Sequence, residues 1–119
     1  MAVSLFGSKS EYQEIIRLLS GEPIDAISVS TYDYKEKAFD TDQNMAQITR
    51  AVTHLPIMIC GKIYDRSSAE DALQDADLVL SAKSMLLNPD WVEDVRAGKP
   101  LPLYRSEEAN IAYTDTPLP

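Results

Sequence analysis

Apolar residues follow two different periods along this chain, and their alternation predicts strands and helices in turn. Short continuous apolar runs of strand length lie at residues 3–6, 24–29, 56–60 and 77–81. Between the first two runs, apolar residues recur at i, i+3, i+4 and i+7, the spacing of one helix face. These residues are Tyr12, Ile15, Ile16 and Leu19. Ser10 is the expected N-cap of this helix, and Gly21 its stop.

Three further helices are expected after the second, third and fourth apolar runs. Residues 42–52 present Met45, Ile48 and Val52 on one face. Ser67-x-x-Glu70 has the form of a capping box that opens a helix with Ala69, Ala72 and Leu73 facing inward. The Asn88-Pro89 step is typical of a helix start, with Asn as cap and Pro in the first turn, and Gly98 is a stop.

This order is a βα unit repeated about four times, which predicts an α/β fold with parallel strands. Near-continuous apolar strands that alternate with helices indicate a parallel sheet covered on at least one face. The units could wind into an open doubly wound sheet or form part of a (β/α)₈ barrel. We expect one domain over residues 1–119, with an irregular tail from about residue 99 that holds four of the seven prolines.

Composition narrows the range of functions. The 119 residues carry a formal charge of −8, without a basic stripe, which argues against nucleic acid as a partner. No apolar run has the length of a membrane span, the amino terminus lacks the pattern of a signal peptide, and a single cysteine gives no sign of an oxidising compartment. A cytoplasmic location is therefore expected. The local concentration of His54, Lys62, Arg66 and Lys83 favours a small anionic ligand.

Two candidate phosphate loops stand in tandem, about twenty residues apart. The runs at 55–63 and 76–83 each end on a small residue followed by a lysine, Gly61-Lys62 in one and Ala82-Lys83 in the other. A small residue lets the backbone approach a ligand, a helix start favours an anion, and a lysine adds charge. Two such loops on neighbouring parallel strands predict one phosphate site, in which both loops bind the same phosphate from opposite sides.

Several of these segments together resemble the carboxyl-terminal part of proteins of the old yellow enzyme family. The members of that family are NAD(P)H-dependent flavin oxidoreductases built on a TIM barrel. The segments are residues 55–63 followed by 67–73, Asp77-Leu78-Val79, and Leu86-Leu87-Asn88-Pro89-Asp90-Trp91. The run at 24–30 is similar to the sixth strand of the family, and the final Pro-Leu-Pro to a family ending. The resemblance covers nearly the whole chain and selects the barrel over the doubly wound sheet.

The resemblance implies that Gly61, Lys62, Ala82 and Lys83 bind the phosphate of FMN. Gly61 matches the first glycine of a Gly-Gly-Ile turn in the family, but Lys62 replaces the second. Ala82 and Lys83 stand where the family has glycine and arginine. Lysine keeps the charge of arginine but lacks its bidentate fork, and alanine permits close approach only if its φ is negative.

A TIM barrel needs roughly 250 residues, so we expect a carboxyl-terminal half-barrel. By resemblance, the other half would carry the flavin-ring contacts, the substrate-binding His/Asn or His/His pair and a proton-donating tyrosine. We therefore expect FMN binding without catalysis by the chain alone, NADH or NADPH being the reductant of the full-length family. The alternative is a non-catalytic α/β half-barrel interaction module. In either case, unpaired edges predict a homo-oligomer or pairing with a complementary half-barrel.

The remaining candidates have simpler interpretations. Cys60 is expected to pack within its strand, the alternative being a redox or flavin-contacting thiol. Trp91 is expected to pack its helix onto the barrel. His54 precedes a strand, at the end opposite barrel active sites. Tyr32 and Tyr34 follow the strand at 24–29; they are expected to cover surface, the alternative being that they line the cofactor face. The acidic residues near Asp40 and Asp42 match no calcium loop, and no metal site is expected.

Overall fold

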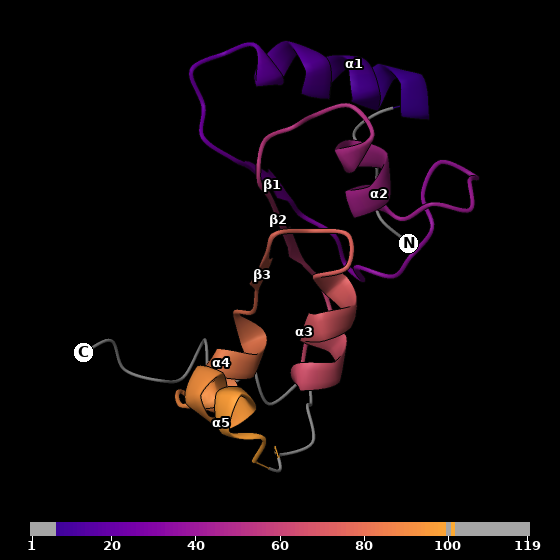
Figure 1. The fold of residues 1–119 in the computed structure, drawn as a ribbon. Coiled ribbons are helices and arrows are strands. Elements are labelled where there is room, and N and C mark those ends of the chain that lie inside the picture. The colour runs from indigo at the N-terminus through magenta and orange to yellow at the C-terminus, as the bar shows by residue number, and fades with distance from the viewer. Residues whose placement is uncertain (1–6, 100, 102–119) are drawn as a thin grey trace.

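A parallel three-stranded sheet forms the centre of the molecule. The structure is a computed structural model and describes residues 7–99 and 101. Strands β1 (Ile27–Val29), β2 (Ile57–Cys60) and β3 (Leu78–Leu80) are hydrogen-bonded in the order β1-β2-β3 (Figure 1). The α/β fold with parallel strands predicted from the sequence is thus confirmed, as an open sheet. The strand expected at 3–6, and the expected tail beyond residue 101, lie outside the described residues.

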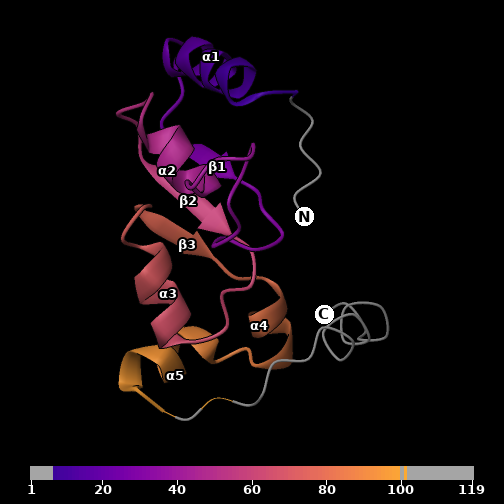
Figure 2. The same ribbon diagram turned by 90° about the vertical axis from the view of Figure 1, so that its right-hand side faces the viewer.

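In the part of the chain that the structure describes, five helices connect and flank the strands. They are α1 (Lys9–Ser20), α2 (Met45–Arg50), α3 (Arg66–Ala72), α4 (Lys83–Leu87) and α5 (Trp91–Ala97). Helices α2 and α3 lie on one side of the sheet, to the right of the strands in Figure 1 and towards the viewer in Figure 2. Helices α4 and α5 lie beyond the carboxyl end of β3, and α1 lies at the opposite end. The short helix α4 is an addition to the predicted elements.

The two faces of the sheet differ in their side chains and in whether helices cover them. The face towards α2 and α3 carries buried aliphatic side chains in register, Ile27 beside Ile57 and Val29 beside Ile59. Ile48 of α2 is fully buried in the same core. Because paired residues of parallel strands point to the same face, these isoleucines and the valine form a continuous apolar layer under the helices.

The opposite face carries a second row of side chains that no described helix covers. Ser28, Met58 and Leu78 are paired across the three strands, and Cys60 is paired with Leu80. Leu78 is 52% exposed and Leu80 41% exposed, while Met58 and Cys60 are half-buried. We call Ser28, Met58, Cys60, Leu78 and Leu80 the open face. In a closed barrel this side of the sheet faces the packed interior.

Three helices begin at a side-chain cap, and two of the caps differ from those predicted. Ser8, not Ser10, caps α1 and accepts from the amide of Glu11. Asp65, not Ser67, caps α3 in a capping box with Ser68. Polar residues cluster at both sites, so the cap is selected by which side chain reaches the N3 amide.

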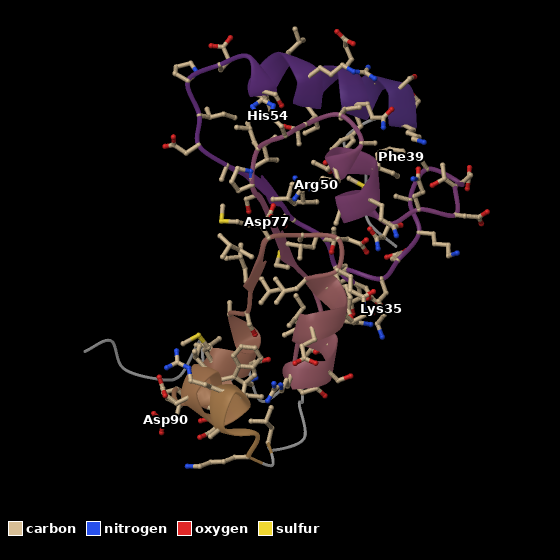
Figure 3. All side chains as sticks on the ribbon, in the orientation of Figure 1. Lys35, Phe39, Arg50, His54, Asp77 and Asp90 are labelled. Atoms are coloured by element: carbon tan, nitrogen blue, oxygen red, sulfur yellow. The ribbon has the colours of Figure 1, made fainter. Side chains whose placement is uncertain are left out.

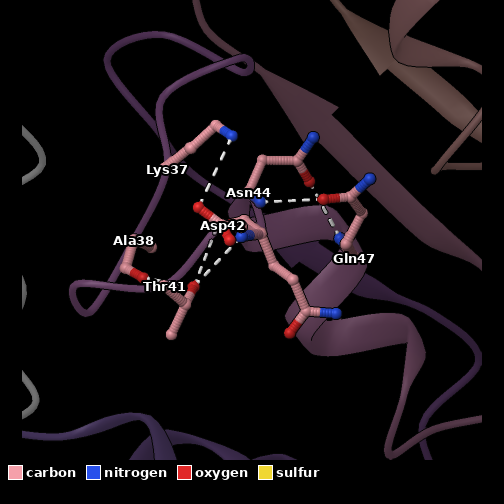
Figure 4. Close-up of polar contacts among 7 residues, drawn as sticks. Lys37, Ala38, Thr41, Asp42, Asn44 and Gln47 are labelled. Carbon is pink, nitrogen blue, oxygen red and sulfur yellow. Dashed lines mark hydrogen bonds and ion pairs between the residues drawn. The ribbon is translucent and has the colours of Figure 1, made fainter.

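The loop before α2 is organised by similar contacts. Asn44 and Gln47 form a reciprocal capping box at the start of α2 (Figure 4). The hydroxyl of Thr41 donates to the carbonyl of Ala38 at 2.7 Å. The helix therefore begins at Met45, after a tight polar turn, instead of at residue 42 as expected.

An ion pair closes the amino-terminal end of the sheet. Asp77, just before β3, accepts from the Arg50 guanidinium and from the amide of Ile57 (Figure 3). The Ile57 amide, and then Arg50, hold the pKa of Asp77 below its ordinary value. A carboxyl with a lowered folded pKa stabilises the fold above its unfolded pKa, and this contribution is lost as the pH falls through the folded value. His54 is exposed at this same end, as predicted.

Burial of the helices agrees in part with the sequence pattern. Trp91 is buried, as predicted, and its Nε1–H donates to the carbonyl of Tyr64 at 2.7 Å. Leu19 and Leu73, both expected to face inward, are exposed. Leu73 follows the last residue of α3, Ala72, and caps the helix. α5 begins at Trp91, after an N-cap at Asp90 in place of Asn88. Within residues 7–99 and 101, no helix is long and apolar enough to cross a bilayer.

Candidate functional site

A cavity of about 350 Å³ lies at the carboxyl ends of all three strands. It is lined by the residues that follow each strand, among them Thr31 and Tyr32 after β1, Gly61 and Lys62 after β2, and Ser81 and Ala82 after β3. This edge of a parallel sheet is where α/β folds bind ligands. The structure therefore brings together the two turns that the sequence predicted as one site.

The β1 and β2 turns are packed directly against each other at Gly61. Gly61 has a φ of +117°, and a Cβ there would lie 2.5 Å from the carbonyl oxygen of Thr31 and 2.9 Å from the carbonyl carbon of Tyr32. The Thr31 hydroxyl donates to the carbonyl of Cys60 at 2.6 Å, and the Tyr34 amide donates to the carbonyl of Gly61 at 3.2 Å. Glycine is required here by the neighbouring loop, whatever ligand the cavity takes.

Lys62 continues this turn in a left-handed conformation with a φ of +53°. That region favours glycine, which is the residue that the family resemblance places at this position. The Lys62 ammonium lies 4.8 Å from the centre of the Tyr32 ring, in cation–π contact. The lysine therefore sits at the mouth of the cavity at the cost of an unfavourable backbone conformation.

The turn after β3 is tied to the turn after β2 through one carbonyl. The hydroxyls of Ser81 and Ser84 donate to the carbonyl of Ile63 at 3.0 and 3.1 Å. Ala82 has a φ of −90° and caps α4 without a side-chain hydrogen bond. Because this φ is negative, alanine at position 82 still permits a ligand to approach the backbone closely. Lys83 begins α4, and its side chain lies outside what the structure describes.

The lining of the cavity favours negative charge. Among the described residues that line it, Lys62 is the one charged residue, and none is acidic. A neighbouring cavity of about 390 Å³ is different, since Asp33, Asp65 and Asp71 line it together with Lys35 and Lys62. The Lys62 side chain thus stands between a cavity without carboxylates and one that contains three.

Two tyrosines after β1 have different surroundings. Tyr34 is buried, and its hydroxyl donates to Asp71 at 2.8 Å. Burial, followed by the hydrogen bond to Asp71 and by nearby carboxylates, raises the pKa of Tyr34 well above its ordinary value. Tyr34 therefore anchors the loop to α3, whereas Tyr32 is 66% exposed at the cavity mouth. Surface cover was expected for both, and this interpretation is wrong for Tyr34.

Sequence reasoning did not place Thr31, Ser81 or Ser84 in the site. The available signal was positional, because each follows a predicted strand within a few residues and parallel strands end at one edge. Cys60 packs only partly, since it is half-buried on the open face and also lines the cavity. Within the described part of the chain, no group of three or more His, Cys, Asp or Glu residues could hold a metal ion.

Comparison with known proteins identifies the fold. No protein-family model matches the chain, and no curated protein matches it in sequence. Among solved structures, morphinone reductase in complex with tetrahydroNAD matches with 22% identity and a TM-score of 0.65. A second structure of morphinone reductase matches with 19% identity and a TM-score of 0.61. Each match covers 92% of this chain.

The chain spans about 30% of the length of these neighbours. Morphinone reductase belongs to the old yellow enzyme family, and the matched part is a fragment of its TIM barrel. The similarity to part of such a barrel, inferred from sequence motifs, is thus confirmed at the level of the fold.

Proposed function

We propose that this chain is the FMN-phosphate-binding part of a flavin oxidoreductase similar to old yellow enzymes. The observation that supports the proposal best is the cavity that joins the turns after β2 and β3. Gly61, Lys62, Ala82 and Lys83 would hold the phosphate, through backbone amides and two ammonium groups. The likeness to morphinone reductase supports the same assignment, because the matched part is a TIM-barrel fragment.

The described residues fit the phosphate end of the cofactor. The lining without carboxylates and the cation at the mouth suit a dianion, and the volume is at the lower end of the roughly 300–1,000 Å³ typical of ligand cavities. FMN, when bound, would supply hydride chemistry with NADH or NADPH as reductant. The chain alone would not turn over at an enzyme-like rate, because the ring and substrate contacts implied by the resemblance are absent from its sequence. A cytoplasmic location belongs to the same proposal.

Substitution of Lys83 tests the phosphate assignment. We expect Lys83→Ala to weaken FMN binding by about 1–3 kcal/mol, the scale of a hydrogen bond to a charged group. The quenching of flavin fluorescence on titration with the protein measures the affinity. Riboflavin lacks the phosphate and should bind the unmodified protein far more weakly than FMN does. The affinity for riboflavin should be the same in the variant as in the unmodified protein.

A matched control separates this local effect from the change in net charge. Lys37→Ala removes one positive charge from the loop before α2, where Lys37 pairs with Asp42 away from the cavity. Its affinity for FMN should equal that of the unmodified protein. Equal affinities for FMN and riboflavin, or equal losses in the two lysine variants, would contradict a phosphate site at Lys83.

The open face supports a second proposal, that two copies of the chain associate. Leu78 and Leu80 expose apolar surface on β3, which lies at one edge of the described sheet. Exposed edges and apolar patches favour association, and a two-fold dimer is the commonest symmetric outcome. A second copy would cover the open face by pairing edges to close a barrel. The other candidate for the occupant of the open face is a complementary half-barrel from a different chain. In that case this chain would act as an interaction module.

Sedimentation at micromolar concentration tests this association. We expect the mass of a dimer for the unmodified chain and that of a monomer for Leu80→Glu, because a carboxylate would be buried without a partner at the joined faces. Leu18→Glu places the same charge on an exposed leucine of α1 and should leave the dimer intact. A monomer mass for the unmodified protein would rule the dimer out.

A further inference from the structure

Tyr32 and Lys62 form a pair at the mouth of the strand-end cavity, and the pair has a role that the phosphate proposal does not include. The Lys62 ammonium lies 4.8 Å from the Tyr32 ring centre, and both residues line the same cavity. Tyr32 is 66% exposed, so the ring is held by little else among the described residues. The contact joins the turn after β1 to the turn after β2.

The backbones that carry the two side chains are fixed relative to each other. The Thr31–Tyr32 segment fills the space where a Gly61 Cβ would stand, and two hydrogen bonds connect the loops on either side. Lys62 is in a left-handed conformation that its turn imposes. The Cα atoms that carry the ring and the ammonium are therefore fixed relative to each other, and the contact has to order only the side-chain torsions of Tyr32 and Lys62.

The Lys62 side chain lines two cavities that differ in charge. In the neighbouring cavity, Asp33, Asp65 and Asp71 offer carboxylates to an ammonium group. Within the described residues, however, no ion pair involves Lys62. The ammonium instead contacts the Tyr32 ring, which lines the cavity free of carboxylates and not the acidic one.

We propose that Tyr32 is a positioning residue, which holds the Lys62 ammonium at the strand-end cavity and away from the acidic one. This inference rests on the proposed function, since the held ammonium acts on the phosphate of the ligand. Tyr32 itself need not touch the phosphate. An aromatic face suffices for the contact, so phenylalanine should replace tyrosine and leucine should not.

The contact can be measured without any ligand. A ring face shifts protons above it upfield in the NMR spectrum, so the Hε protons of Lys62 should resonate upfield of those of Lys37. The shift should persist in Tyr32→Phe and disappear in Tyr32→Leu. A Lys62 resonance at the ordinary lysine position in the unmodified protein would overturn the inference.

The functional consequence is measured with FMN and with inorganic phosphate as probes. We expect Tyr32→Leu to weaken both about two- to fivefold, the effect of an exposed cation–π contact, and Tyr32→Phe to leave both unchanged. In a Lys62→Met background, Tyr32→Leu should have no further effect, because the group that it positions is gone. A merely structural role for Tyr32 would weaken binding equally in both backgrounds, which would overturn the inference.

The outcomes also separate this inference from the proposal on which it rests. If the unmodified protein binds FMN and Tyr32→Leu binds it equally well, the positioning role is wrong and the phosphate site stands. If the unmodified protein binds neither FMN nor phosphate, both are wrong.

Discussion

Gly61→Ala should lower the free energy of unfolding by about 3 kcal/mol, a large part of the 5–15 kcal/mol typical of a domain. Two costs combine at this position. A φ of +117° is strained for any residue with a Cβ, and that Cβ would lie 2.5 Å from the backbone oxygen of Thr31. A backbone atom tied into the β1 turn cannot move aside as the end of a side chain can. Urea unfolding followed by circular dichroism measures the change.

Gly98→Ala is the matched control, because it makes the same substitution at another positive φ. Gly98 ends α5 with a φ of +68°, and apart from its chain neighbours and the backbone of α5, no described residue lies within 4 Å of its Cβ position. The backbone strain alone should cost about 1 kcal/mol. Equal losses of stability in the two variants would show that the contact with Thr31 has no energetic weight.

The second large effect is expected at Trp91, where truncation to alanine should cost about 3–5 kcal/mol. Its side chain is buried with 7% of its surface exposed and packs in the core cluster. The Nε1–H donates to the carbonyl of Tyr64, in the segment between β2 and α3. Trp91→Ala would therefore remove both a large apolar contact and the hydrogen bond that holds α5 to the β2 side of the sheet.

Two further variants divide this effect. Trp91→Phe keeps most of the aromatic packing but loses the hydrogen bond, and should cost about 1 kcal/mol from the bond. Val92→Ala changes the adjacent exposed residue of α5 and should stay within about 0.5 kcal/mol of the unmodified protein. A loss in Trp91→Ala no greater than in Val92→Ala would mean that α5 does not contribute to the core.

The elements that could be predicted from the sequence are those with a local signal. Strand-length apolar runs located β1, β2 and β3, and capped amphipathic stretches located α1, α2, α3 and α5. The caps themselves were less predictable, since Asp65, Ser67 and Ser68 all have suitable side chains and only the folded backbone decides which reaches an amide. Helix α4 has only five residues, too few to show a period.

The tertiary features needed information that no local pattern holds. Gly61 was recognised as special, but its contact with Thr31 joins residues thirty positions apart. Leu78 and Leu80 belong to an apolar run that indicates a strand buried on both faces, yet they lie on the open face. A strand of a closed barrel would have the same continuous apolar run. Such a run indicates that both faces of the strand are to be buried, but it does not indicate which part of the protein, or which partner, covers them.

The order β1-β2-β3, which follows the order of the chain, has a consequence for how the sheet can grow. Each strand pairs with the one that precedes it in the sequence, so a nascent chain can complete one βα step before the next is synthesised. No strand has to be inserted between two that are already joined. Within residues 7–99 and 101, β3 is then the growing edge, and a strand from any source could extend the sheet there by β-augmentation without breaking an existing pair.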